Sequence, residues 1–128
     1  MNAFSAIQRY SSVKVQSGVE SASPHRLIQM LFEGALERIA QAKGAMQQNN
    51  IALKGELISK AARIVAGLQG CLNDAEGGDL AESLDSLYSY IIRRLTKANL
   101  DNDPAILDEC TALISEAKAG WDAIGSGF

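Results

Sequence analysis

Histidine and the acidic side chains are the residues of this sequence that could bind a metal or transfer a proton. His25 is the only histidine, and it follows Pro24 at the start of a predicted helix. Di-metal sites in helical bundles use Glu-x-x-His pairs on two helices, and no such set of carboxylates accompanies His25. Four carboxylates fall on polar faces of predicted helices, where we expect them to be solvated: Glu33, Glu37, Asp85 and Asp108. The sequence therefore predicts no metal site and no cofactor.

The chain shows no motif for covalent or phosphoryl chemistry. Gly-rich phosphate loops follow a β-strand, and the periodicity predicts no strand. The sequence also lacks the elbow motif that surrounds a nucleophilic serine. One alternative stays open, a phosphotransfer bundle that uses His25. Such bundles present their histidine in mid-helix, whereas His25 is expected in a first turn and partly exposed. We predict that the protein is not an enzyme.

Composition narrows the class of protein and its surroundings. The 128 residues carry a net charge of −3 with a pI near 5.1, which argues against the basic face that a nucleic-acid binder needs. No apolar run approaches the ~20 residues that cross a membrane, and the amino terminus does not resemble a secretory signal. Cys71 and Cys110 stand at apolar positions without CxxC spacing, which predicts buried, reduced thiols. Together these features predict a globular protein of the cytoplasm.

Apolar residues recur at intervals of three and four along most of the chain, the pattern of amphipathic helices. Because only short turns separate them, we predict an all-α fold, an antiparallel up-and-down four-helix bundle. Residues 1–22 are weakly patterned and are predicted to form an amino-terminal capping segment, a short helix or irregular, before a bundle over 23–128. The four helices are expected at about 24–48, 51–74, 80–100 and 104–124.

Each predicted helix is preceded by a residue that can cap it. Proline follows the cap at the first and fourth helices, which is the usual place for proline in a helix. At the third helix, Glu82 is expected to reach back to the amide of Asp79, as in a capping box. The expected N-caps are Ser23, Asn49 or Asn50, Asp79 and Asp103.

Two regions carry more apolar side chains than a closed bundle needs. Phe4, Ile7 and Tyr10 are spaced by three, so we hypothesise an amino-terminal segment that docks on the bundle and can detach. The second helix has two overlapping apolar seams, which suit burial against two neighbours or against one neighbour and a bound guest. From this periodicity we choose four positions for a binding groove: Ile58, Val65 and Leu72, with Leu84 on the third helix.

The third helix presents aromatic and basic side chains. Tyr88 and Tyr90 are two residues apart and therefore point to different sides, one into the core and the other toward a groove or solvent. Arg93 and Arg94 lie near the carboxyl end, where they can complement the helix dipole or anchor acidic or carbonyl groups of a partner. From its residues alone, the chain is interpreted as a helical bundle that binds a protein.

Three motifs stand in order along the chain. The first is the pair Ile7 and Tyr10, and the second reads Ser21-Ala22-Ser23-Pro24-His25-x-Leu27-Ile28-x-Met30-Leu31-Phe32-Glu33-Gly34-Ala35. The third reads Leu87-Tyr88-x-Tyr90-x-x-Arg93-Arg94-Leu95-x-x-Ala98-Asn99-x-x-Asn102-Asp103. Together they resemble the FliS family, flagellar secretion chaperones that escort flagellin. Phe4 and Phe32 stand where members of this family often have tyrosine, which removes a hydroxyl and keeps the apolar role.

The resemblance implies a fold, partners and site residues. It implies a four-helix bundle whose amino-terminal segment covers part of an apolar surface. The expected partners are the disordered carboxy-terminal segment of flagellin, which would wrap the bundle and become helical, and the cytoplasmic domain of the flagellar export gate. Other flagellar regulators stay open as partners, as does the alternative of a bundle that binds another secreted protein or dimerises. The matching positions are Ile7 and Tyr10 for the cap and gate docking, and Tyr88, Tyr90, Arg93, Arg94 and Asn99 for the third-helix signature.

Overall fold

The computed structural model describes residues 22–72 and 78–125, and these residues form helices and turns without a strand. The predicted amino-terminal segment, with Ile7 and Tyr10, lies outside the described residues. The all-α fold and the four-helix bundle are confirmed. The helices are α2 (Pro24–Gln47), α3 (Ile51–Cys71), α4 (Asp79–Asp101) and α5 (Pro104–Ile124).

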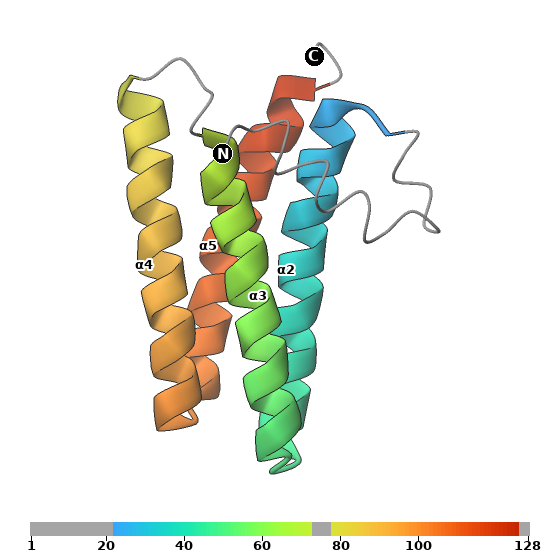
Figure 1. Ribbon diagram of the computed structural model, residues 1–128, viewed down its shortest axis with the longest axis vertical. Coiled ribbons are helices and arrows are strands. Elements are labelled where there is room, and N and C mark those ends of the chain that lie inside the picture. The colour runs from blue at the N-terminus through green and yellow to red at the C-terminus, as the bar shows by residue number, and fades with distance from the viewer. Residues whose placement is uncertain (1–21, 73–77, 126–128) are drawn as a thin grey trace.

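The helices pack as a ring in which each one contacts its two neighbours. Helix α2 packs against α3 and α5, and α4 packs against the same two helices. Figure 1 shows that α2 and α4 run downward in the view while α3 and α5 run upward, the up-and-down arrangement that was expected. The first turn of α2 and the last turn of α5 therefore lie at the same end of the bundle.

Side-chain caps fix three of the four helix starts, as predicted. The hydroxyl of Ser23 accepts from the amide of Arg26 at 3.1 Å, and Pro24 follows the cap. The side chain of Asn50 accepts from the amide of Leu53 at 3.3 Å. At α5 the carboxylate of Asp103 accepts from the amide of Ala105 at 2.9 Å. Each bond satisfies an amide that has no partner within its own helix.

The predicted cap at α4 is wrong. The N-cap is Gly78, which has a φ of 114° and no side chain to accept a bond, and Asp79 is the first helical residue. A positive φ of this size suits glycine, so the backbone turns at Gly78 and the helix starts one residue earlier than a cap at Asp79 would place it. Asp79 and Glu82 both lie in the first turn, where the helix dipole favours their negative charge.

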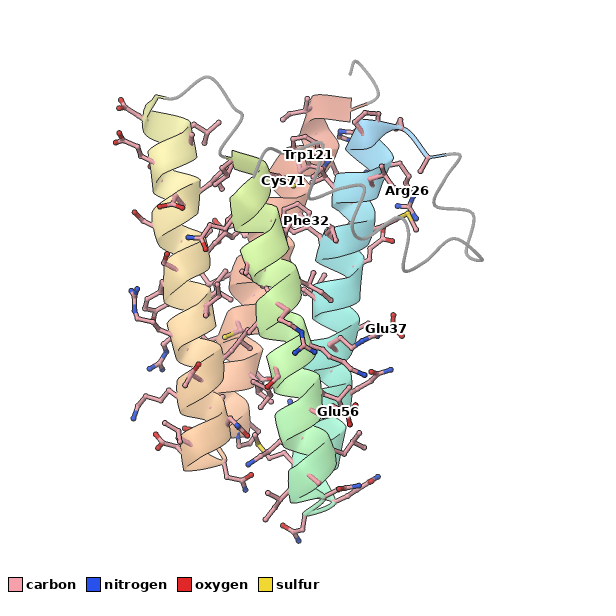
Figure 2. The ribbon with its side chains drawn as sticks, viewed as in Figure 1. Arg26, Phe32, Glu37, Glu56, Cys71 and Trp121 are labelled. Carbon is pink, nitrogen blue, oxygen red and sulfur yellow. The ribbon has the colours of Figure 1, made fainter. Side chains whose placement is uncertain are left out.

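Buried side chains from all four helices form one core. Phe32 of α2 is 2% exposed and lies within the bundle (Figure 2). Of the two predicted buried thiols, Cys110 is fully buried and Cys71 is half-buried at the end of α3. Burial raises the pKa of Cys110 to about 11, so this thiol is neutral near pH 7. The largest fully buried side chains are Phe32, Ile39, Ile91, Leu95, Leu107, Ile114, Val65 and Cys110.

Within the described part of the chain, no helix combines the length and the apolar character needed to cross a membrane.

Candidate functional site

The two tyrosines of the third-helix signature take different environments, as their spacing predicts. Tyr88 is 4% exposed in the core, and burial raises the pKa of its hydroxyl to about 12. Tyr90 is half-buried on the side of α4 that faces α5, and its hydroxyl donates to Oε2 of Glu109 at 2.6 Å. This hydrogen bond raises the pKa of Tyr90, with burial as a further cause. The hydroxyl of Tyr90 is therefore engaged in a hydrogen bond to α5 and links the two helices.

Arg94 donates to the same carboxylate. Its Nε lies 2.7 Å from Oε1 of Glu109, so both oxygens of this acid accept a bond from α4. We call Tyr90, Arg94 and Glu109 the Glu109 clasp. Hydrogen bonds from Tyr90 and Arg94 lower the pKa of Glu109, and the bond to Glu109 raises that of Arg94. The sequence did not indicate this clasp, because it depends on the register of α4 against α5.

Arg93 differs from Arg94 in its exposure and in its contacts. Arg93 is exposed, and its guanidinium carbon lies 5.9 Å from the centre of the Tyr90 ring, within the range of a cation–π contact. Arg94, by contrast, is engaged with Glu109. Of the two arginines, Arg93 is the one whose charge is accessible to a partner.

Asn99 lies in the last turn of α4, next to the turn that joins α4 to α5. The buried ammonium of Lys54, on α3, donates to the carbonyl of Asn99 at 3.1 Å and to Oδ1 of Asn102 at 3.0 Å. Asn102 has a φ of 53°, the left-handed conformation common at helix ends. Gly55 approaches the Asn99 side chain, where an added Cβ would lie 3.9 Å from Oδ1. The carboxyl end of the signature thus has a structural role, which is to connect three helices.

Lys54 is a residue that the sequence reasoning missed. A signal was present, because Lys54 continues the apolar spacing of α3 that runs through Ile58, Ala61, Val65 and Leu68. A lysine in that register is buried only if another element supplies acceptors, and the acceptors lie 45 and 48 residues away in the chain. The side chain is 5% exposed.

The four positions chosen for a groove fall into two groups. Ile58 and Val65 are 3% and 0% exposed within the core, so they could reach a partner only if the helices moved apart. Leu72 and Leu84 are half-buried, at the end of the bundle where α3 ends and α4 begins. Contact of these residues with a partner stays a prediction.

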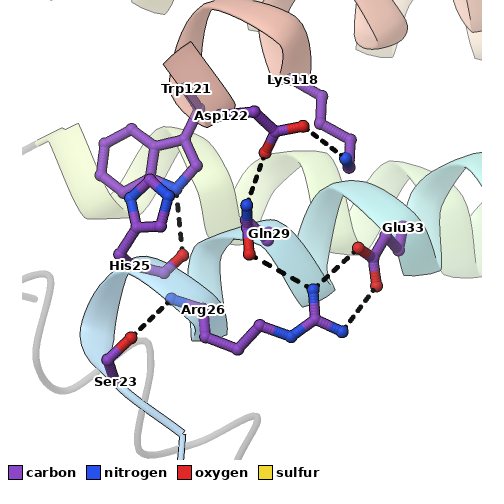
Figure 3. Close-up of polar contacts among 8 residues, drawn as sticks. All are labelled: Ser23, His25, Arg26, Gln29, Glu33, Lys118, Trp121 and Asp122. Atoms are coloured by element: carbon purple, nitrogen blue, oxygen red, sulfur yellow. Dashed lines mark hydrogen bonds and ion pairs between the residues drawn. The ribbon is translucent and has the colours of Figure 1, made fainter. Parts of the chain in front are cut away.

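His25 lies at that same end, between α2 and α5. Its ring stacks on Trp121 with centroids 4.8 Å apart and planes at 16°, and Trp121 Nε1 donates to the His25 carbonyl at 3.0 Å (Figure 3). The side chain is 7% exposed, so the expectation of partial exposure is wrong. The stacking partner comes from α5, 96 residues along the chain, and could not be inferred from local sequence. A buried, stacked ring does not suit exchange of a phosphoryl group with a donor protein.

Polar side chains extend this contact between α2 and α5. Asp122 accepts from Gln29 Nε2 at 2.7 Å and from Lys118 Nζ at 2.6 Å, and these two bonds lower the pKa of Asp122. Arg26 donates to both oxygens of Glu33 at 2.9 and 3.2 Å, as Figure 3 shows. The bond of Gln29 to Asp122 therefore joins α2 to α5, whereas the pairs Arg26–Glu33 and Lys118–Asp122 each lie within one helix.

The fold and the site define a class of protein. Within residues 22–72 and 78–125, no group of three or more His, Cys, Asp or Glu side chains is placed to hold a metal ion. The polar clusters described above link helices to one another. The class of protein that the described residues define is an antiparallel four-helix bundle.

Comparison with known proteins shows the family. The family model "Flagellar protein FliS" matches residues 6–127, and this chain belongs to that family. Flagellar secretion chaperone FliSB of Pseudomonas aeruginosa is 50% identical over 124 residues, which cover 97% of this chain and 98% of that protein. Flagellar secretion chaperone FliS of Vibrio cholerae is 46% identical over 93% of this chain and 88% of its own length. The protein of the same name from Salmonella typhimurium is 43% identical over 94% of this chain and 90% of its own. The resemblance stated from the motifs is confirmed.

Proposed function

We propose that this protein is a cytoplasmic flagellar secretion chaperone that catalyses no reaction. It binds the disordered carboxy-terminal segment of flagellin, prevents premature polymerisation and delivers its client to the cytoplasmic domain of the export gate. The observation that carries the proposal is the family match over residues 6–127, together with relatives that are named flagellar secretion chaperones.

The physical chemistry of the bundle supports a client that folds on binding. A disordered segment loses conformational entropy when it becomes helical, so a broad apolar surface is needed to offset that cost. Helix-in-groove recognition supplies such a surface along neighbouring helices. The chain carries partly buried apolar side chains on all four helices, among them Leu36, Ile64, Leu72, Leu84 and Leu113.

Several site residues are assigned by this proposal. Ile7 and Tyr10 contribute to export-gate docking, as the family resemblance implies. Arg93 is the accessible basic anchor on α4. Arg94 and Tyr90 support the surface indirectly through the Glu109 clasp.

Calorimetric titration with the carboxy-terminal segment of the cognate flagellin, followed by circular dichroism, tests the proposal. We expect one-to-one binding, a negative heat-capacity change from apolar burial and a gain of helix as the segment orders. A peptide of the same composition in scrambled order is the control, because it keeps the charge and the apolar content but loses the helical stripe. Absence of both heat and helix gain with the authentic segment would overturn the proposed client.

A further inference from the structure

Four exposed residues share the outer side of the second half of α4. Their spacing of three and four residues places them along one face of the helix. The core lies on the opposite side of α4, where Ile91, Leu95 and Ala98 are 0% exposed. We call these four residues the Arg93 face, and they are Arg93, Thr96, Lys97 and Leu100.

Neither neighbouring helix covers the Arg93 face. Toward α5, helix α4 presents Tyr90 and Arg94, which bond to Glu109. Toward α3 it presents Asn99, whose carbonyl accepts from Lys54. The Arg93 face lies between these two sides of the helix and is therefore turned away from the bundle.

The Arg93 face is basic, although the chain as a whole is acidic. Residues 86–100 contain three basic residues and no acidic one, in a chain with a net charge of −3. Arg94 bonds to a carboxylate of α5, and Lys97 pairs with an exposed acid one turn further along α4. Arg93 forms no ion pair with any other described residue. Its charge is therefore available to another molecule.

The helix dipole does not account for this position of Arg93. The effect of the dipole is confined to the last turn of a helix, and the last turn of α4 holds no basic residue. Arg93 lies eight residues before Asp101, the end of the helix, which is about two turns. Of the two roles expected from the sequence, contact with a partner is therefore the one that the structure favours for Arg93.

The side chain of Arg93 rests on an aromatic ring that is itself held in place. Its guanidinium carbon lies 5.9 Å from the centre of the Tyr90 ring, and the Tyr90 hydroxyl donates to Glu109 at 2.6 Å. A restrained guanidinium loses less conformational entropy on binding, and its planar group can hold a carboxylate through two parallel bonds. Glu109 is therefore a positioning residue for Arg93, acting through Tyr90.

An apolar group completes the face. Leu100 is 79% exposed and lies seven residues from Arg93, about two turns or ~10 Å along the helix. A single exposed leucine is common on protein surfaces, but this one stands at a fixed distance from an available cation. The two groups together match a helix that carries a carboxylate and an apolar side chain two turns apart.

We propose that the Arg93 face binds a short acidic amphipathic helix of a second protein, distinct from the flagellin segment. Carboxylates of this helix pair with Arg93 and Lys97, and its apolar side chain contacts Leu100. The inference goes beyond the proposed function, because it gives Arg93 a partner of defined chemistry that can bind alongside the client.

Charge and apolar content favour this occupant over others. A segment that folds on binding needs a broad apolar surface, whereas the Arg93 face offers one leucine. Residues 1–21 of the chain carry two basic residues and one acidic residue, so they lack the complementary charge. Asp85 and Asp101 flank the face along α4 and would repel the phosphates of a nucleic acid.

A designed helical peptide, with a leucine and glutamates at the matching spacing, is the first probe. The control peptide has lysine in place of each glutamate. In an NMR titration of the full-length protein, we expect the glutamate peptide to shift amide signals within residues 90–101, with weaker binding at higher salt. Shifts confined to other helices, or equal binding of the two peptides, would overturn the proposal.

Matched substitutions test the two anchors. Arg93→Gln and Leu100→Ser should each weaken binding of the glutamate peptide about fivefold, through loss of an ion pair and of an apolar contact. The controls are Lys60→Gln, which removes an exposed charge from α3, and Leu80→Ser, at a leucine that is 72% exposed at the start of α4. All four residues are exposed, so the fold should be retained, and the controls should change binding by less than about twofold. Equal effects of test and control variants would contradict the assignment.

Glu109→Gln tests the positioning role. The substitution removes a negative charge, which by itself would strengthen binding of an acidic peptide. If Glu109 positions Arg93 through Tyr90, the glutamate peptide should instead bind about twofold more weakly. Stronger binding would show that Glu109 acts through charge alone and would overturn its positioning role.

The flagellin segment separates this inference from the proposed function. We expect the glutamate peptide to bind equally well when the flagellin segment is already bound. Displacement of the peptide by that segment would assign the Arg93 face to the client and overturn the proposal. Binding of the peptide without any binding of flagellin would remove the proposed client and retain this inference. Light scattering that shows a dimer lost in Arg93→Gln would assign the face to a second copy and would likewise overturn the proposal.

Discussion

Glu109 accepts one hydrogen bond on each carboxylate oxygen, from Tyr90 at 2.6 Å and from Arg94 at 2.7 Å. These bonds favour the ionised form and hold the pKa of Glu109 below its ordinary value of 4.5. A carboxyl group whose pKa is lowered on folding stabilises the protein above its unfolded pKa. That stability is lost as the pH falls through the folded pKa.

We predict that Glu109→Gln lowers the melting temperature near neutral pH and that the deficit shrinks in acid. As the pH falls from above the ordinary pKa of 4.5 through the lowered pKa of Glu109 in the folded protein, the wild type loses the contribution of the ionised clasp, whereas the variant has none to lose. Thermal melts followed by circular dichroism across this range measure the difference. Glu56→Gln, at an exposed Glu56–Lys60 pair, is the control and should track the wild type. A deficit that stays constant with pH would show that the clasp acts through shape alone.

At the scale of the helices, the two short turns use the same backbone device for different purposes. Asn49 follows α2 with a φ of 59°, and Asn102 follows α4 with a φ of 53°. Glycine adopts this conformation without strain, and asparagine adopts it more readily than most residues. Asn102 has a further role, because its side chain accepts from the buried ammonium of Lys54.

We therefore predict consequences of different size for glycine at the two turns. Asn49→Gly should change the free energy of unfolding by less than ~1 kcal/mol, since glycine fits the positive φ. Asn102→Gly should lower it by about 1–3 kcal/mol, because it removes an acceptor from a buried charge. Urea unfolding of both variants measures the two values. Equal losses would mean that the bond from Lys54 to Asn102 contributes little.

The helix starts show what local sequence can and cannot predict. Ser23, Asn50 and Asp103 were identifiable as caps because each bonds to an amide two or three residues away. Asp79 was misassigned because the positive φ of Gly78 depends on the path of the chain into α4, which residue types alone do not specify. Lys54 was missed for a related reason, since its acceptors belong to another helix.

At the scale of the whole molecule, the bundle is closed more completely at one end than at the other. From Ile91 to the end of α4, and in the first half of α5, the apolar side chains between these two helices are almost fully buried. At the same end, hydrogen bonds from Lys54 link α3 to the end of α4 and to the turn that follows it. Toward the start of α4 and the end of α5, the apolar side chains are only partly buried or are exposed. Regions with fewer buried apolar contacts open locally at lower free-energy cost than the core does.

Amide hydrogen exchange should therefore divide α4 into two parts. We predict that residues 91–98 exchange only through global unfolding, whereas residues 81–87 exchange at least about tenfold faster through local opening. Exchange measured by mass spectrometry or NMR, with and without low urea, distinguishes the two routes. Uniform protection along α4 would contradict the difference in cover between its halves.

The difference between fully buried and partly buried positions explains how much of the candidate site could be predicted from the sequence. Periodicity selected Leu72 and Leu84 as positions of a binding groove, and they are half-buried at one end of the bundle. It selected Ile58 and Val65 on equal grounds, yet these lie within the core, because spacing alone does not say which half of a seam is covered. The opposite environments of Tyr88 and Tyr90 were predictable from a separation of two residues, but the bond of Tyr90 to Glu109 required the register of two helices.

The ring of helices also has a consequence for how the chain folds. Three of its four interfaces join helices that are consecutive in the sequence, and such local contacts form quickly. The interface of α2 with α5 is the exception, since the bonds of Gln29 to Asp122 and of Trp121 to His25 span 93 and 96 residues. The loop that this interface closes is the longest of the four and therefore has the largest loop-closure entropy, so we expect α5 to dock on α2 after the other contacts have formed. We therefore expect this topology to fold rapidly and to complete its native state at the contact between α2 and α5.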